Sequence, residues 1–373
     1  MENVDNLITF VMLIKDRAAY TVRWMQYANS THFPFEVLIA DGGADKQLEN
    51  CLKDKNSYPN VNYQYLRYPF DGTRELFYKK TVDVLYRVKT PYVAFIDDDD
   101  FIAVEAVRAS IKFLESNPDY SVCRGKNLAF FLDRKDKKPF FQFQPLHFLD
   151  ISNNSAVDRL RKVQPYFSGT FYDVHRTTNY QFIFEKVAEI NIHFLNMIEM
   201  LVAYMDAAMG KIKRLNQLYL FREFGHGQST SDKVDHLTSL LTGPSSENLE
   251  KICRVVATEV SKSESVDIEV LAKQLHRDFL RFYVPTLSNQ LYAHYDIPFK
   301  RVLQNLRTWL IRAIQKTNKR IAKLLRSSSE LMMRRKKSKE LGAYIRANQH
   351  EKKLLSDMQI FLKDYKVSKE FES

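Results

Sequence analysis

Apolar runs and amphipathic stretches alternate along the first third of the chain. Uninterrupted apolar runs rich in β-branched residues suit parallel strands that are buried on both faces. Stretches with apolar positions at helical spacing lie between most of these runs and predict helices. The predicted strands are Leu7–Ile14, Phe35–Ala40, Asn62–Leu66 and Tyr92–Ile96, and the predicted helices are Ala18–Ser30, Thr73–Val88 and Val104–Glu115. This order predicts an α/β fold with a Rossmann-like, doubly wound, mainly parallel sheet.

The remainder of the chain has a more helical pattern. Residues 124–180 are irregular and rich in Phe and Tyr, which fits either the core of a subdomain or an aromatic platform for a ligand. Ile183–Met209 is predicted as one helix that ends at Gly210, and Lys213–Phe221 as a strand. From Ser231 onward we expect a helical C-terminal extension.

The positive charge of the chain is concentrated in one segment. The formal net charge is +11, and 14 Lys or Arg residues but a single acid, Glu330, lie between Ile297 and Lys339. Residues 300–326 form an amphipathic pattern with a basic polar face, which fits a solvated face, contact with an anionic membrane surface, or nucleic-acid binding. Nucleic acid is not expected as a partner, because Trp309 is the only aromatic residue there.

Cysteine usage and the N-terminus indicate the compartment. Cys51, Cys123 and Cys253 are odd in number and form no CxxC spacing, so we expect reduced thiols rather than disulfides or a zinc site. The chain begins with a polar stretch and contains no run of about 18 uncharged apolar residues. We therefore expect a cytoplasmic protein, peripheral at the inner face of the membrane if it meets one.

The run of four aspartates, Asp97–Asp100, is the sharpest chemical signal in the sequence. It directly follows an apolar strand, and four adjacent carboxylates repel one another unless a positive group offsets their charge. Mg²⁺ or Mn²⁺, which prefer oxygen ligands, would do so. Two further polar clusters, Lys15-Asp16-Arg17 and Asp41-Gly42-Gly43, follow other strands, so we expect all three around one crevice at the carboxyl edge of the sheet.

Taken together, these motifs resemble those of a known enzyme family. Tyr92–Asp100 resembles the strand and Asp-x-Asp motif of inverting family 2 glycosyltransferases with the GT-A fold. Ile8–Arg17 is similar to the first strand and nucleotide-contacting turn of that family, Val37–Gly43 to its second strand, and Thr73–Lys80 to the helix before the motif strand. The resemblance extends over about residues 5–120 and weakens towards residue 232.

The resemblance implies an inverting, Mn²⁺- or Mg²⁺-dependent transferase that moves a sugar from a nucleotide-diphosphate donor to a hydroxyl of a glycan, lipid or protein. UDP is the expected nucleotide because it is frequent in the family, and cell-surface polysaccharide biosynthesis is the expected setting. Asp97, Asp99 and His226 are the implied metal ligands. The residues implied to bind the nucleotide-sugar are Lys15, Asp16, Arg17, Asp41, Arg74, Asp97 and Asp98.

In the family that this sequence resembles, the general base is typically an acid at the start of a helix that ends in Gly. Glu199, eleven residues before Gly210, fits this spacing, although Ile198 stands where the family commonly has a Glu. Asp206, Glu189 and Asp173 remain alternatives, and Glu199 also fits an exposed helix residue without a catalytic role.

We expect three regions: a GT-A domain over 1–232, a helical extension over 233–296 and a basic amphipathic helical region over 297–373. Two other classes of protein remain open. A nucleotidyltransferase would usually carry a glycine-rich phosphate loop, and no glycine cluster follows Ile14. A non-catalytic scaffold would dock on membrane or nucleic acid through the basic C-terminal helices.

Overall fold

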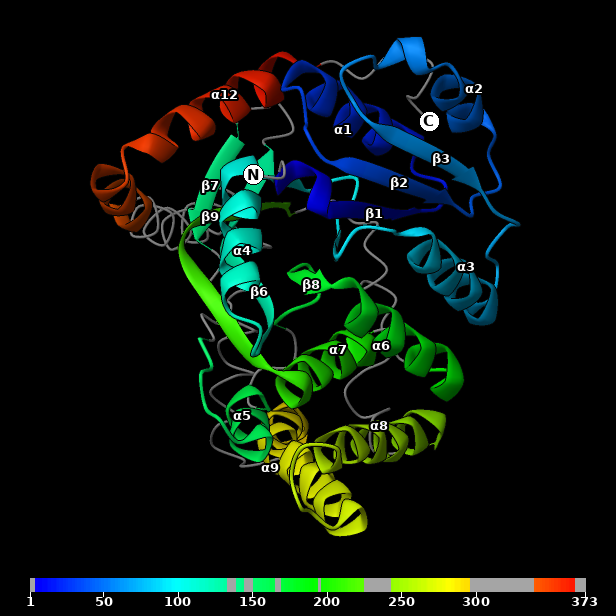
Figure 1. Ribbon diagram of the computed structural model, residues 1–373, viewed down its shortest axis with the longest axis vertical. Helices are drawn as coiled ribbons and strands as arrows, with labels where there is room; N and C mark the ends of the chain where they lie inside the picture. Colours follow the sequence, from blue (N-terminus) through cyan, green and yellow to red (C-terminus); the bar gives the residue numbers. More distant parts are fainter. Residues whose placement is uncertain are drawn as a thin grey trace, which may run out of the picture.

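The computed structural model describes residues 4–132, 139–143, 150–164, 169–193, 196–224, 243–295 and 339–365. A single sheet with the strand order β3-β2-β1-β4-β8-β6-β9-β5 forms its centre, and β7 pairs with β6 (Figure 1). The strands are β1 (Ile8–Ile14), β2 (Glu36–Asp41), β3 (Tyr63–Arg67), β4 (Tyr92–Phe95), β5 (Phe101–Ile102), β6 (Tyr120–Leu132), β7 (Pro139–Phe143), β8 (Val174–Arg176) and β9 (Lys211–Glu223).

The N-terminal half of the sheet is parallel, as the sequence predicts. Strand β1 lies between β2 and β4 and runs parallel to both, and β3 extends the sheet beyond β2. The register places Ile14 beside Asp41, so β1 and β2 end at the same edge of the sheet. The predicted α/β fold with a mainly parallel sheet is thereby confirmed.

The second half of the sheet differs from the prediction. Residues 124–180 were expected to be irregular, yet β6 is a long strand that runs parallel to β9 and antiparallel to β7 and β8. Gly125 allows close packing there, since an added Cβ would lie 2.2 Å from the carbonyl oxygen of Gln217. The prediction of an irregular region is therefore wrong for β6 and β7, because β6 pairs with the distant strand β9 and β7 pairs with β6.

The three helices predicted in the first third of the chain begin and end close to the predicted residues. They are α1 (Ala18–Ser30), α3 (Arg74–Arg87) and α4 (Val104–Ser116). The structure also has α2 (Gln47–Lys53), α5 (Ala156–Val163), α6 (Thr177–Ile190) and α7 (Asn196–Met209), with single turns at Val4–Leu7 and Lys55–Ser57. The single helix predicted over Ile183–Met209 is wrong. Asn191, with φ of 55°, takes the left-handed conformation that ends α6, and α7 starts separately.

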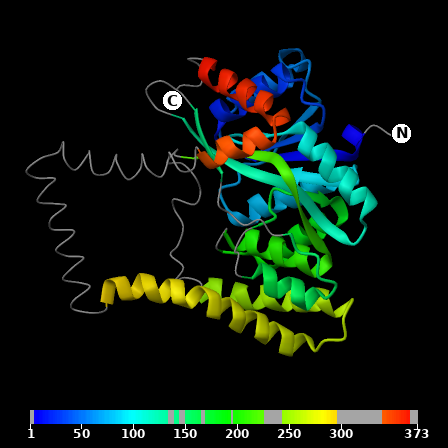
Figure 2. The ribbon, with the colours of Figure 1, turned by 90° about the vertical axis from the view of Figure 1, so that its left-hand side faces the viewer.

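The C-terminal helices pack at two opposite ends of the molecule. Helices α8 (Gly243–Ser261) and α9 (Ile268–Tyr295) lie beyond α6 and α7, whereas α12 (His350–Asp364) lies beside α1 (Figures 1 and 2). The Phe361 ring of α12 lies 5.1 Å from that of Tyr27 between ring centroids. Glu351, which is buried, accepts a hydrogen bond from the backbone N–H of Leu218 at 2.6 Å. The last helix therefore packs on the sheet domain itself.

Several predictions fall on residues that the structure does not describe. The predicted basic helix over 300–326, His226 and the proposed region boundaries after residues 232 and 296 all lie outside the described residues. Among the helices that the structure does describe, none has the length and apolar character needed to cross a membrane.

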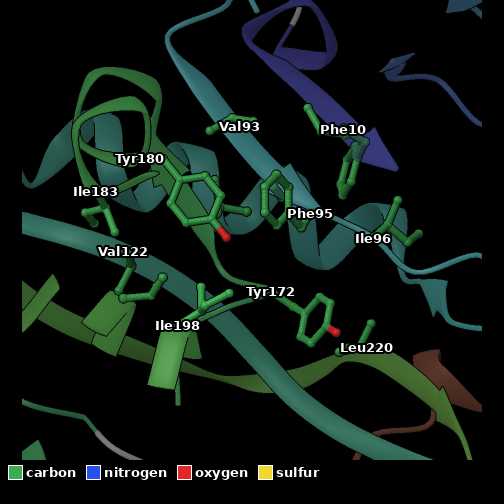
Figure 3. Packing of buried hydrophobic residues seen from close by; sticks show 14 of the residues in the cluster. Phe10, Val93, Phe95, Ile96, Val122, Tyr172, Tyr180, Ile183, Ile198 and Leu220 are labelled. Atoms are coloured by element: carbon green, nitrogen blue, oxygen red, sulfur yellow. The ribbon is translucent and has the colours of Figure 1, made fainter. Parts of the chain in front are cut away.

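Aromatic rings fill the core between β4 and the helices next to it. Phe95 of β4 packs against Tyr180, with ring centroids 4.8 Å apart (Figure 3). It also packs against Phe171 and Phe184, with ring centroids 5.4 and 5.1 Å away. Phe130 is also buried, so Phe130 and Tyr180, which lie between residues 124 and 180, belong to the core. The three cysteines are free thiols, as expected.

Candidate active site

The acidic turn after β4 lies at the edge where β1 and β2 also end. Ile96 continues the pairing with β1 by donating its N–H to the Val11 carbonyl at 3.1 Å. The chain then turns tightly, and the Asp100 N–H donates to the Asp97 carbonyl at 3.2 Å. The turn gives the four carboxylates different surroundings, although they are adjacent in sequence.

Asp98 is the most enclosed of the aspartates that face α1. Its carboxylate lies 2.8 Å from Nε of Arg17 and accepts a hydrogen bond from the Thr21 hydroxyl at 3.0 Å. Arg17 also binds Asp99, with Nη2 2.5 Å from Oδ2. Two of the predicted polar clusters therefore meet through Arg17, which stands directly before the first turn of α1.

Burial and neighbouring charges shift the pKa values of Asp98 and Arg17 in opposite directions. Burial raises the pKa of Asp98 to about 7, although the Arg17 guanidinium opposes the rise. Burial likewise works against the charge of Arg17, yet the carboxylates of Asp98 and Asp99 raise its pKa. The arginine therefore stays charged and offsets part of the repulsion among the aspartates.

Asp97 and Asp100 face β9 and the turn before β8 instead. The Tyr172 hydroxyl donates to Oδ2 of Asp97 at 2.5 Å. Arg222 lies 3.2 Å from Asp100 through Nε and 3.8 Å from Asp97 through Nη2. The Arg222 guanidinium also lies 4.7 Å above the Tyr172 ring. The Glu223 N–H donates to Asp100 at 3.1 Å, which ties the end of β9 to the turn.

Sequence reasoning missed Tyr172 and Arg222. Tyr172 is one of many aromatic residues in its region, and Arg222 had only its place at the end of a strand to mark it. Neither stands near the aspartates in the sequence.

Three of the aspartates are arranged so that they fit a divalent cation. Asp97, Asp99 and Asp100 each offer one carboxylate oxygen, and these oxygens lie within 4.8 Å of one another. An all-oxygen donor set fits Mg²⁺ or Mn²⁺. Burial is the main cause that raises the pKa of Asp100, and the neighbouring carboxylates of Asp97 and Asp99 add to the rise. A cation at this place would relieve the repulsion. Asp97 and Asp99 were predicted as ligands, and Asp100 was not.

The Asp41 carboxylate is enclosed at the end of β2. It accepts hydrogen bonds from the Tyr65 hydroxyl at 2.6 Å, from Nη1 of Arg67 at 2.7 Å and from the Gly43 N–H at 2.8 Å. The residue is 1% exposed. Three donors within the chain thus form hydrogen bonds to the Asp41 carboxylate. Its contact with the base of a nucleotide stays a prediction.

Asp16 bridges the ends of β1 and β2. The residue has φ of 53°, and its carboxylate accepts the N–H groups of Ala44 at 2.6 Å and Asp45 at 3.2 Å. Its observed contacts are therefore with the loop after β2.

Lys15 meets the loop after β3 on the other side. Its Nζ donates to the Asp71 carbonyl at 2.8 Å and lies 4.6 Å from the centroid of the exposed Phe70 ring. Behind it, the buried Lys80 lies 2.6 Å from the Asp71 carboxylate and donates to the Ile14 carbonyl at 3.0 Å. These contacts join the carboxyl end of β1, the loop after β3 and the middle of α3.

Arg74 lies at the start of α3 and is exposed. Its Nη1 donates to the His193 carbonyl at 3.3 Å, in the connection between α6 and α7. The described contact of Arg74 is therefore with this connection.

Glu199 lies in the first turn of α7, within electrostatic reach of Tyr172 and Arg222. Burial raises the pKa of Tyr172 well above its usual range, and the carboxylates of Asp97 and Glu199 add to that rise. Burial opposes the charge of Arg222, yet its acidic neighbours, Glu199 among them, raise its pKa. Glu199 is therefore close to the two residues that contact Asp97.

The three alternatives to Glu199 have other partners. Glu189 is exposed on α6 and lies 2.5 Å from the Lys186 ammonium. Asp206 is buried on α7, with its carboxylate 3.3 Å from Nδ1 of His175. Asp173, also buried, lies between two guanidinium groups and is described further below.

Comparison with known proteins yields a likeness of fold. No family model matches the chain, and no curated protein matches it in sequence. The solved structure of S. aureus TarS 1–349 is 14% identical with a TM-score of 0.48 and covers 84% of this chain and 82% of its own. The same protein in complex with UDP-GlcNAc is 15% identical with a TM-score of 0.48, covering 83% and 80%.

A longer S. aureus TarS structure is 14% identical with a TM-score of 0.46 and covers 74% of this chain. The present chain spans 43% of that TarS chain. At these sequence identities and TM-scores, the likeness to TarS says nothing about the activity of this chain.

Proposed function

We propose that this protein is a metal-dependent glycosyltransferase, similar to family 2, that inverts the anomeric carbon of a sugar taken from a nucleotide-diphosphate donor. The observation that carries the proposal is the convergence of Asp97, Asp99 and Asp100, with one oxygen of each within 4.8 Å of the others, at the carboxyl edge of a GT-A sheet. Ligands of open α/β sheets bind at this edge.

The residues around the acidic turn have distinct proposed tasks. Asp97, Asp99 and Asp100 would hold Mn²⁺ or Mg²⁺, which supplies charge neutralisation for the departing nucleoside diphosphate. Arg17 keeps Asp98 and Asp99 in place through its two ion pairs. His226 is proposed as a further ligand on the basis of the family resemblance alone.

Glu199 is proposed as the general base that takes the proton from the acceptor hydroxyl. Its place in the first turn of α7, within electrostatic reach of Tyr172 and Arg222, supports this role over Asp206, which is buried beside the His175 ring, and Asp173, which is buried against the Arg214 guanidinium. Glu189 is exposed on another helix.

The nucleotide is proposed to lie along the ends of β1 and β2, near Lys15, Asp16 and Asp41, with Arg74 as a phosphate contact. UDP is the proposed nucleotide, and UDP-GlcNAc, bound in one TarS structure, is the first donor to test. The acceptor is proposed to be a glycan, lipid or protein hydroxyl, and residues 300–326 are proposed to make peripheral membrane contact.

The test is a thermal-shift and hydrolysis screen with UDP-, GDP- and CMP-sugars, each with and without Mn²⁺. We expect one donor to stabilise the protein selectively and only with the metal. Asp99→Ala should abolish the shift and the turnover while the protein stays folded, and Asp83→Ala, on the exposed face of α3, is the matched control. If no donor changes the thermal stability or is hydrolysed, and the protein binds liposomes tightly, the results would favour a non-catalytic scaffold instead.

A further inference from the structure

A short turn before β8 carries Tyr172 to the acidic cluster. Residues 169–173 form this turn, and the Tyr172 hydroxyl reaches Oδ2 of Asp97 at 2.5 Å. Figure 3 labels Tyr172 among the buried hydrophobic residues of the core, together with Ile96, which precedes the aspartates, and Leu220 of β9. Tyr172 is 8% exposed, whereas the side chain of Asp97 is 41% exposed. The hydroxyl therefore contacts an aspartate that solvent or a ligand can also reach.

We propose that Tyr172 is a positioning residue for the metal ligand Asp97, fixing one of its oxygens so that the carboxylate is oriented for the cation before the cation binds. The inference rests on the proposed function. It concerns how the site is built, because a carboxylate accepts hydrogen bonds and a tyrosine hydroxyl can donate one. Hydrogen bonds of this kind orient the carboxylates that hold metal ions.

Four consecutive carbonyls of the turn are each engaged by a buried side chain from another part of the chain. These contacts are Arg214 Nη2 to the Gly169 carbonyl at 2.8 Å, His175 Nε2 to that of Thr170 at 2.9 Å, Tyr180 Oη to that of Phe171 at 2.8 Å and Tyr219 Oη to that of Tyr172 at 2.9 Å. The supporting side chains come from β8, β9 and α6.

The side chain of the next residue, Asp173, is a further anchor of the turn. Asp173 is fully buried and lies 2.5 Å from Nη1 of Arg214 and 3.1 Å from Nε of Arg124. Breaking a buried ion pair is costly, so this anchor resists displacement. The Tyr172 hydroxyl is thus held by the fold rather than by Asp97, which is what a positioning residue requires.

Removal of the hydroxyl should change the orientation of Asp97. Arg222 is the nearest other cation in the described part of the chain, with Nη2 3.8 Å from the same Oδ2. Without Tyr172 to hold it, the half-exposed carboxylate can turn towards this guanidinium. We therefore expect the oxygens of the Asp97 carboxylate to be less well oriented for binding the cation.

The experiment measures Mn²⁺ affinity of the full chain directly, by isothermal titration calorimetry or by electron paramagnetic resonance of free Mn²⁺. Tyr172→Phe keeps the ring and should weaken Mn²⁺ binding by about 10- to 100-fold, the usual effect of removing such a supporting hydrogen bond. The matched control is Tyr92→Phe, which removes a hydroxyl that donates to Glu115 at 2.6 Å from the opposite end of β4. The control should bind Mn²⁺ like the wild type.

Two further variants separate orientation from folding. In an Asp97→Asn background, Tyr172→Phe should change Mn²⁺ affinity little, because the hydroxyl acts through the carboxylate that is already gone. Tyr219→Phe loosens the same turn from β9 and should weaken Mn²⁺ binding in the same direction by a smaller factor. This variant keeps the test open if Tyr172→Phe does not fold.

The outcomes distinguish the two proposals. If the wild type binds Mn²⁺ and Tyr172→Phe binds it equally well, the positioning role is wrong and the proposed function stands. If the wild type binds no Mn²⁺ with or without donor, both the positioning role and the metal dependence of the proposed function are wrong.

Discussion

Arg17 binds Asp98 and Asp99 at the same time, with Nε 2.8 Å from one carboxylate and Nη2 2.5 Å from the other. A guanidinium can make two such contacts because its donors form a planar fork, whereas an ammonium cannot reproduce that geometry. The turn after β1 and the acidic turn after β4, which are far apart in sequence, are therefore connected by a single side chain.

Arg17→Lys is expected to destabilise the protein. Hydrogen bonds to charged groups contribute roughly 1.5–3 kcal/mol each, and Lys can keep only part of that stabilisation. We expect a loss of about 1–3 kcal/mol in the free energy of unfolding, measured by urea denaturation with an unchanged m-value. Arg87→Lys, at an exposed pair with Asp83, is the control and should change stability little. Equal effects in both variants would contradict the role of Arg17.

Asp41→Asn should destabilise the fold as well as impair donor binding. Tyr65 and Arg67 donate to one oxygen of Asp41, and the Gly43 N–H donates to the other. The NH₂ group of an Asn would therefore face either the Gly43 N–H or the Tyr65 and Arg67 donors, and leave them without an acceptor. Leaving a buried donor unpaired costs about 1–3 kcal/mol. Thermal unfolding of this variant should shift downward without any ligand present. Loss of nucleotide binding at unchanged stability would instead assign Asp41 to the base alone.

The buried ion pair of Lys80 and Asp71 is expected to stabilise the packing of α3 against the loop after β3. Both side chains are at most 3% exposed, and Nζ lies 2.6 Å from the carboxylate. Removing one partner leaves a buried charge, so Lys80→Met should cost about 3–5 kcal/mol. The double variant Lys80→Met with Asp71→Asn should recover part of this loss, because no uncompensated charge remains. Urea denaturation of the two variants measures the difference.

Thiol reactivity should separate the three cysteines. Burial raises the pKa of Cys123 and of Cys253 to about 12, so both remain protonated, and hence poor nucleophiles, at pH 8. Cys51 is half-buried. A disulfide reagent such as DTNB should modify one thiol quickly in the native protein and all three in denaturant. Cys51→Ser should remove the fast reaction, and rapid reaction of two thiols would contradict the buried positions.

Local patterns were enough to predict the elements around β1 and the acidic turn. The helix at Ala18–Ser30 begins and ends at the predicted residues, and β4 follows the predicted apolar run. These elements depend on apolar spacing and on the residues that end each run, which are properties of neighbouring residues. The aspartates were recognisable for the same reason, since all four are adjacent in the sequence.

Only the tertiary structure decided which groups surround those aspartates. Tyr172 and Arg222 reach Asp97 from the turn before β8 and from the end of β9, and Asp100 joins Asp97 and Asp99 because the turn folds its carboxylate back. The long β6, and the break between α6 and α7 at Asn191, likewise escaped local reasoning. The sequence by itself determined the parallel half of the sheet and the acidic motif, because those follow from short-range periodicity. The partners of each carboxylate depend on strand pairing and packing between residues more than 70 positions apart, which no local pattern specifies.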